Sequence, residues 1–153
     1  ILLYVSFRFD FRFGVAAVLA LILVAVMALG FISLAGIEVT ITVIAAVLTA
    51  IGYGVNDSIV ISDRIRENLK KLRKEPLSEV VNKSVNATLG RTVVTSLTTL
   101  VVLLSLLILG AASIRDFAAV MIVGLVTSTC SSICVVANVV VEWEARFPSK
   151  TRR

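Results

Sequence analysis

The chain has 153 residues, of which 58% are hydrophobic and only 16% are charged. Soluble domains are closer to half apolar and a quarter charged, so the composition argues against an ordinary soluble domain. The net charge of +5 comes from Lys and Arg residues that lie in short blocks, with long uncharged stretches between them. This placement of charge indicates a membrane protein more strongly than the composition does.

Four uncharged stretches are near or above the length that crosses a bilayer as a helix: 14–37, 39–56, 92–114 and 117–141. A hydrocarbon core of about 30 Å needs about 20 helical residues. The four segments are apolar nearly all round, whereas a helix in a soluble bundle needs only an apolar stripe. Strands are disfavoured because an open sheet edge would leave backbone groups unpaired in lipid. We therefore expect an all-α, polytopic transmembrane bundle rather than a hydrophobic soluble bundle.

The bundle is expected to hold four complete spans and the end of a fifth. In chain order the expected elements are the end of a transmembrane helix at 1–7, a cytoplasmic loop at 8–13, a span at 14–35, a periplasmic loop at 36–39, a span at 40–62, cytoplasmic amphipathic helices at 63–90, a span at 91–111, a periplasmic loop at 112–116, a span at 117–143 and a basic cytoplasmic tail at 144–153. The opening segment is too short to span and lacks the basic start and cleavage site of a signal peptide. We expect it to be the last part of a helix from a longer protein.

The basic residues set the expected orientation, because basic loops stay in the cytoplasm. The connections alternate: 8–13 is basic, 36–39 has no Lys or Arg, 63–83 is strongly basic, 112–116 has a single Arg beside an Asp, and the tail is basic again. This alternation is consistent with the four spans. The basic segments are expected to contact anionic lipid headgroups, and nucleic-acid binding is not needed to explain the net charge.

The segment from Ile61 to Pro76 has a helical pattern with one apolar stripe, formed by Ile61, Ile65, Leu69 and Leu72. Pro76 is expected to end this helix, and Ser78 to be the N-cap of a second one. We expect a helical hairpin that lies along the membrane surface with its apolar side in the interface. A docking surface for a cytosolic partner is the alternative use of the same charges.

Two charged residues interrupt the apolar stretches. Asp57 has apolar sequence on both sides, and Arg91 opens the span at 91–111. A charge inside a spanning helix costs on the order of 3 kcal/mol or more and tends to mark an ion or proton pathway. A proton relay is physically reasonable, because a guanidinium that approaches or leaves a carboxyl changes the proton affinity of that carboxyl. The alternative is structural: Asp57 caps or ends a helix, and Arg91 extends to the interface.

Polar and small residues accompany these charges on both helices. Threonines follow Arg91 on the same helix face, so a polar stripe is expected to enter the membrane from its cytoplasmic side. Beside Asp57, amide and hydroxyl groups add polar atoms, and two glycines let helices approach closely or bend. The supporting residues are Asn56, Ser58, Thr95, Thr98, Gly52 and Gly54.

The last span carries small polar residues that suit helix–helix packing better than lipid contact: Thr127, Ser128, Thr129, Ser131 and Ser132. Cys130 and Cys134 lie four residues apart, but the chain has no His and no other Cys. A metal site would therefore have almost no ligands, and we expect both cysteines to be packing residues. The sequence shows no phosphate loop and no nucleophile with a base beside it, so no enzymatic activity is expected.

Four segments resemble the signatures of a known family. They are FRFDFRF at 7–13, IGYGVNDSIVISDRIREN at 51–68, NATLGRTVVTSLTT at 86–99 and IRDFA at 114–118. Together they are similar to SecF, a family of protein-export membrane proteins, and the resemblance covers essentially the whole chain. It implies an RND-type fold with six spans and a periplasmic domain after the first, of which this chain holds the end of the second span and spans three to six.

The resemblance also implies partners and a role. SecF pairs with SecD, which is a separate chain or fused to it, and the pair uses the proton-motive force to assist translocation of a preprotein through SecYEG. SecD, SecYEG, the preprotein and the accessory protein YajC are thus the implied partners. The implied coupling ion is the proton, with no cofactor. The implied location is the bacterial inner membrane, with several spans and a cytoplasmic C-terminus.

Individual residues match the family as well. Asp57 in the fourth span and Arg91 in the fifth correspond to its membrane-embedded charges, so the resemblance implies that they form a proton relay, completed by an acidic residue of SecD. The family often has a His-Asp pair midway along its third span. The corresponding positions here are Leu23 and Val24, which argues against a proton role for that helix.

Two other functions remain open at this point. A solute or lipid transporter of the same RND superfamily would have a large porter domain upstream. A non-energised scaffold that only packs against the translocon would tolerate loss of Asp57 but not bulky substitutions at Gly52 or Ser128.

Overall fold

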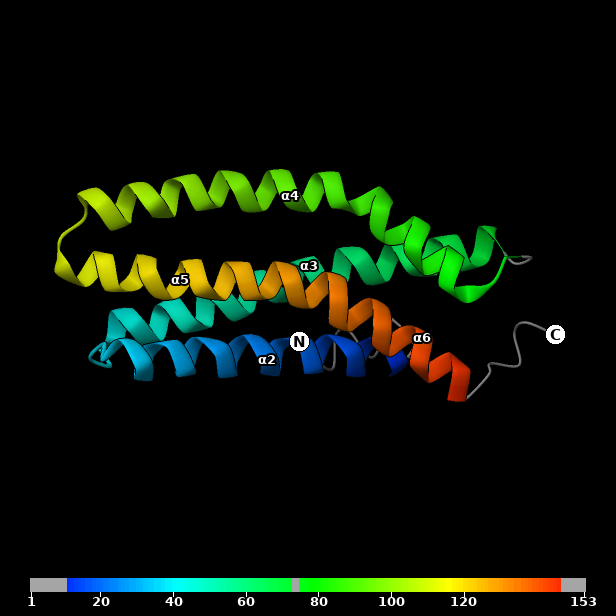
Figure 1. Cartoon of the computed structure of the whole chain (residues 1–153), viewed down its shortest axis with the longest axis horizontal. Coiled ribbons are helices and arrows are strands. Elements are labelled where there is room, and N and C mark those ends of the chain that lie inside the picture. The colour runs from blue at the N-terminus through cyan, green and yellow to red at the C-terminus, as the bar shows by residue number, and fades with distance from the viewer. Residues whose placement is uncertain (1–10, 73–74, 147–153) are drawn as a thin grey trace.

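The computed structural model describes residues 11–72 and 75–146, and within these ranges every regular element is a helix. The helices are α2 (Phe11–Ala35), α3 (Ile41–Lys71), α4 (Leu77–Leu109), α5 (Ala112–Ser131), a π-helical turn (Ser132–Val136) and α6 (Ala137–Arg146). The last three follow one another without a break, and Figure 1 shows the rod bending where α5 passes into α6. The expectation of an all-α fold is confirmed.

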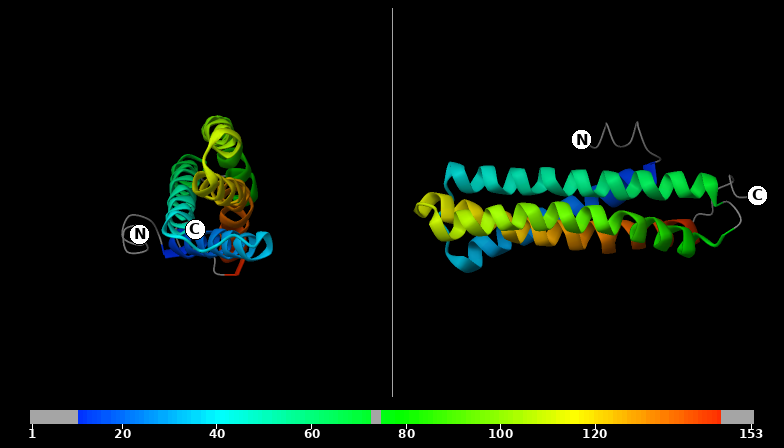
Figure 2. Two further views of the ribbon diagram at one scale, coloured as in Figure 1. Left: turned by 90° about the vertical axis from the view of Figure 1, so that its left-hand side faces the viewer. Right: turned by 90° about the horizontal axis from the view of Figure 1, so that it is seen from above.

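The long helices form an elongated bundle around the pair α3 and α5 (Figures 1 and 2). α5 packs most extensively on α3, and each of these two helices also contacts α2 and α4. The end-on view in Figure 2 shows α2 and α4 on opposite sides of this central pair. The interior is therefore formed mainly between α2, α3 and α5.

Four helices are long and apolar enough to cross a membrane: Gly14–Ala35, Ile41–Leu69, Leu77–Leu109 and Ala112–Glu142. Much of their apolar surface faces outward. In the most hydrophobic window of α4 only 11% of the residues are buried, and its exposed side chains include Val94, Val101 and Leu109. Helices that are apolar on their outer faces are typical of a membrane-embedded bundle.

The turn between α2 and α3 shows how local sequence ends one helix and begins the next. Gly36 has a φ of 62°, a conformation that glycine adopts without a steric penalty. The amide of Ile37 donates to the carbonyl of Ile32 at 3.1 Å, which is the bond of a Schellman motif. Four residues later, the Thr40 hydroxyl accepts from the amide of Val43 at 3.3 Å and caps α3.

The middle segment differs from the expected surface hairpin. α3 runs as one rod through Lys71 (Figure 2), and α4 begins at Leu77 with Pro76 as its N-cap, so the prediction of Ser78 as N-cap is wrong. Nothing in the sequence breaks the helix after 62, and Ile61 and Ile65 are buried in the bundle rather than laid in the interface. The residues expected as separate amphipathic helices at 63–90 are therefore the ends of α3 and α4.

Three further boundaries differ from the prediction. α5 begins at Ala112, so the loop expected at 112–116 is helical, and its Arg115 side chain donates from Nε to the carbonyl of Gly110 at 2.8 Å. At the other end the helix extends to Arg146, past the boundary expected at 143. α2 begins at Phe11, inside the loop expected at 8–13. The predicted elements at 1–7 and 147–153 lie outside the described residues.

Candidate functional site

The buried apolar residues form two clusters that follow one another along the bundle. One contains Ala20, Ile61 and Val140, and the other contains Val24, Ala50 and Leu125. The buried polar side chains of α3, α5 and the π-helical turn gather where these clusters meet. We call this set the polar layer; its members are Asp57, Ser58, Ser62, Ser128, Ser131 and Ser132.

Close packing of α3 on α5 places the polar layer. A Cβ built on Gly124 would overlap the Cβ of Ala50, and a Cβ on Gly54 would lie 3.1 Å from the Ser128 hydroxyl. Only small residues allow two helices to approach this closely. The two residues of each contact are separated by the same number of positions in the sequence, so α3 and α5 run parallel and in register. One helical turn further along, the same register pairs Ser58 with Ser132.

Asp57 lies inside the bundle, and its side chain is 4% exposed. Within residues 11–72 and 75–146, its Oδ2 atom has no hydrogen-bond partner. A buried carboxyl without a compensating partner is costly. Asp57 lies in the middle of α3, so the alternative that it caps or ends a helix is wrong.

Arg91 does not meet Asp57 in this structure. Its side chain is exposed on α4, and among the described residues no ion pair or hydrogen bond joins the two. Thr95 and Thr98 are exposed too, so the polar stripe that begins at Arg91 faces out of the bundle. The hydroxyls of Thr95 and Thr98 bond to carbonyls of their own helix, at 3.0 and 2.9 Å.

The supporting residues on α3 divide between two faces. Ser58 is 1% exposed and Gly54 packs on Ser128, so both belong to the interior. Gly52 and Asn56 are exposed, and a Cβ on Gly52 would meet nothing within 4 Å. Gly52 therefore makes no close contact with another of the described helices, in contrast to the packing role expected for it.

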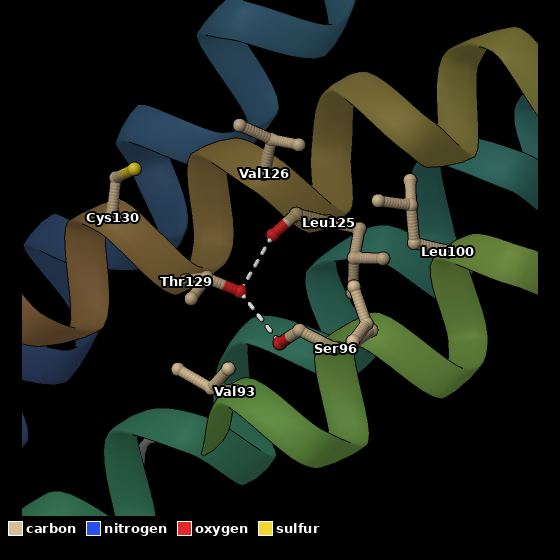
Figure 3. A pocket seen from close by; sticks show the side chains of 8 residues that line it. Val93, Ser96, Leu100, Leu125, Val126, Thr129 and Cys130 are labelled. Atoms are coloured by element: carbon tan, nitrogen blue, oxygen red, sulfur yellow. Dashed lines mark hydrogen bonds between the residues drawn. The ribbon is translucent and has the colours of Figure 1, made fainter. Parts of the chain in front are cut away.

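Hydroxyl bonds join α4 to the central pair. The Tyr53 hydroxyl lies 3.0 Å from Thr99 Oγ1 and donates to the carbonyl of Thr95 at 3.2 Å. Ser96 and Thr129 place their hydroxyl oxygens 2.9 Å apart, beside an apolar groove of about 240 Å³ between α4 and α5 (Figure 3). The groove opens on the outer side of the bundle and does not include Asp57.

A metal site finds no support in the part of the chain that the structure describes, where no group of three His, Cys, Asp or Glu residues comes together. Cys130 and Cys134 are free and exposed. The expectation that they pack inside the chain is therefore wrong. Cys130 lines the groove between α4 and α5.

Two features of the site were not expected from the sequence. Ser62 is buried one turn after Ser58, and the only signal for it is the four-residue spacing of two serines in an apolar helix. The π-helical turn at Ser132–Val136 packs against α2 and α3 beside the polar layer. Such turns are rare and frequent at functional sites, but hydrophobic periodicity does not predict them.

Together, the four apolar helices and the polar interior around the buried Asp57 define a multi-pass membrane protein. The sequence profile described as "Protein export membrane protein SecD/SecF, C-terminal" matches residues 1–146. The chain belongs to this family. The resemblance to SecF and the RND-type helical architecture are thereby confirmed.

Individual relatives agree with this placement. The chain is 56% identical over 146 residues to the protein translocase subunit SecDF of Thermus thermophilus, which covers 95% of this chain and 20% of that protein. It is 44% identical over 139 residues to the protein translocase subunit SecF of Rickettsia akari, with 91% and 45% covered. It therefore spans less than half the length of each of these relatives.

Solved structures agree as well. A crystal structure of SecDF in a super-membrane-facing form superposes with a TM-score of 0.91 at 55% identity, covering 95% of this chain and 20% of that one. A second crystal structure of SecDF, described as a translocon-associated membrane protein from Thermus thermophilus, superposes with a TM-score of 0.90 at 55% identity and the same coverage. At this identity the likeness extends beyond the fold to the residues themselves.

Proposed function

We propose that this chain is the membrane part of a Sec protein-export subunit that uses proton flow to drive preprotein translocation. The family and the names of its relatives, which are protein translocase subunits, support the export role. In this proposal the chain works with SecD and SecYEG, and YajC joins the same assembly. The coupling ion is the proton, and no cofactor takes part.

Asp57 is the observation that carries the proton part of the proposal. The carboxyl is 4% exposed inside a bundle of apolar helices, and its Oδ2 has no partner among the described residues. An acidic residue at the centre of a spanning helix costs on the order of 3 kcal/mol and is kept mainly where ions or protons pass. A carboxyl held only for stability would be bonded to a neighbouring donor.

Arg91 is the second member of the proposed relay. It lies on α4, which is the least buried of the four candidate spans. In the proposed cycle α4 moves so that Arg91 approaches Asp57 in one state and leaves it in another, which alternately favours the charged and the neutral carboxyl. The outward position of Arg91 corresponds to the separated state.

The proposed setting is the bacterial inner membrane, with the tail at 144–153 in the cytoplasm. The block at 63–83 and the tail carry most of the basic residues. Basic connections remain on the cytoplasmic side, where anionic headgroups attract them. The connection between α2 and α3 has no Lys or Arg and faces the periplasm in this proposal.

The test uses the full-length protein in membrane vesicles, with export of a preprotein measured in the presence and absence of a proton gradient. Asp57→Asn and Arg91→Met should each abolish the gradient-dependent stimulation, while the variants still assemble with their partners. Asp63→Asn is the matched control, because it removes the same charge from an exposed position on the same helix. It should export like the unmodified protein.

The same assay separates the alternatives. Normal gradient-dependent export in both relay variants would reject the proton relay and favour a non-energised scaffold. A solute or lipid transporter would show lost efflux rather than lost export. Failure of Asp57→Asn and Asp63→Asn alike would point to a fault in assembly, which recovery of the complex in detergent measures directly.

A further inference from the structure

Several buried or half-buried hydroxyls in this bundle bond to the backbone of their own helix. The group includes Ser84, Thr88, Thr129 and Ser132, whose oxygens bond to carbonyls three or four residues earlier. This is the usual way in which Ser and Thr are accommodated within a helix. Ser58, Ser62 and Ser128 differ: each is about 1% exposed, and none has a hydrogen-bond partner within the described residues.

The three unpartnered hydroxyls lie on facing surfaces of two helices. Ser58 and Ser62 are one turn apart on α3, so they share a face. Ser128 lies on α5 against Gly54, which is one turn before Ser58. Oδ2 of Asp57, one residue before Ser58, is also buried and without a partner among the described residues. Four unsatisfied polar groups thus lie on the adjacent, closely packed helices α3 and α5.

This clustering is the reverse of what a dry interior favours. A buried hydroxyl that makes no hydrogen bond is destabilising, and each of these serines could satisfy its proton by rotating back to its own helix, as the other hydroxyls do. Their side chains instead leave donors and acceptors available to a common partner. Beside them the chain changes from α5 to the π-helical turn, which also packs against α3.

We propose that the polar layer holds resident water molecules, bound by the hydroxyls of Ser58, Ser62 and Ser128 and by the carboxyl of Asp57. Water fits this set because each molecule donates and accepts, as the three hydroxyls require, and buried waters typically bridge polar groups that would otherwise be unsatisfied. A metal ion fits less well, because the described residues hold no cluster of metal-ligating side chains. The inference stands whether or not Asp57 carries protons.

The sign of a stability change tests the proposal. If the layer is dry, replacing each serine by alanine removes an unsatisfied hydroxyl and leaves the unfolding midpoint unchanged or raises it. If the hydroxyls hold water, Ser58→Ala, Ser62→Ala and Ser128→Ala each lower the midpoint by a few degrees. The measurement is thermal unfolding of the full-length protein in detergent. Ser105→Ala is the control, since Ser105 is exposed and bonds to its own helix at 2.9 Å.

The triple variant and a density map complete the test. Residues that share bound water should show coupled effects, so the triple variant should lose less stability than the three single losses together. A map fine enough to show ordered water should contain it between Ser58 and Ser128. Unchanged or raised midpoints in all three single variants would overturn the proposal. Lowered midpoints with a map that shows no water at this place would overturn it as well.

Discussion

The contact between Gly124 and Ala50 gives the sharpest prediction for the fold. A methyl group added at Gly124 would overlap the Cβ of Ala50, which is bonded directly to the helix backbone and cannot rotate away like the end of a flexible side chain. Overpacking of this kind typically costs about 1–3 kcal/mol. Replacing a glycine in a helix gains about 0.5–1 kcal/mol. We therefore expect Gly124→Ala to lower the free energy of unfolding by about 1–2 kcal/mol.

The matched control is Gly52→Ala on the neighbouring helix. A Cβ there meets nothing within 4 Å, so only the helix gain remains and the variant should be more stable by about 0.5–1 kcal/mol. Ala50→Gly should rescue Gly124→Ala, because the new methyl would then face the Cα of residue 50 at 3.6 Å. Equilibrium unfolding in mixed detergent measures all four proteins. Equal stability of Gly124→Ala and Gly52→Ala, or a failure of the rescue, would refute the close packing of α3 on α5.

Two further predictions concern other contacts. Tyr53→Phe removes the hydroxyl that lies 3.0 Å from Thr99 Oγ1 and should lower the free energy of unfolding by about 0.6 kcal/mol, as is usual for a hydrogen bond between membrane helices. Thr99→Val should lower the free energy of unfolding by about the same amount. A double variant that loses the full sum of the two single effects would show that the two residues act separately. Gly36→Ala should destabilise the protein by about 1 kcal/mol, because the φ of 62° at Gly36 is unfavourable for alanine. The control Gly90→Ala, where a Cβ has open space around it, should stabilise the protein. Equal effects of the two substitutions in the same unfolding assay would contradict the Schellman turn at Gly36.

The sequence predicts the spans well because length and uniform hydrophobicity decide them. It also places Asp57 between apolar segments of one helix, where a carboxyl avoids lipid only by facing the interior of the bundle. It does not give the direction in which Gly52 and Asn56 face, because α3 is apolar on nearly every side and periodicity cannot select the inner face. That choice depends on where Gly124 and Ser128 of a distant helix allow close approach.

Helix boundaries failed for a related reason. The change from apolar to charged residues near Ile61 marks a change of solvent, not the end of a helix, and α3 continues through it. The loop expected at 36–39 does separate α2 from α3, and the structure adds that Gly36 and Thr40 cap the two helices there. The π-helical turn at Ser132–Val136 packs against α2 and α3, and no local sequence pattern predicts it.

The contacts of α4 differ in kind from those of α3 and α5, and this difference bears on movement. α3 and α5 interlock through small residues whose contacts cannot shift without a steric clash. α4 is instead attached by side-chain hydrogen bonds, among them Tyr53 to Thr99 and Ser96 to Thr129. Such bonds are worth about 0.6 kcal/mol each between membrane helices, and hydroxyls that lose one partner can bond to a carbonyl of their own helix. These hydrogen bonds can exchange during the movement of α4, the helix that carries Arg91, which the proposed relay requires.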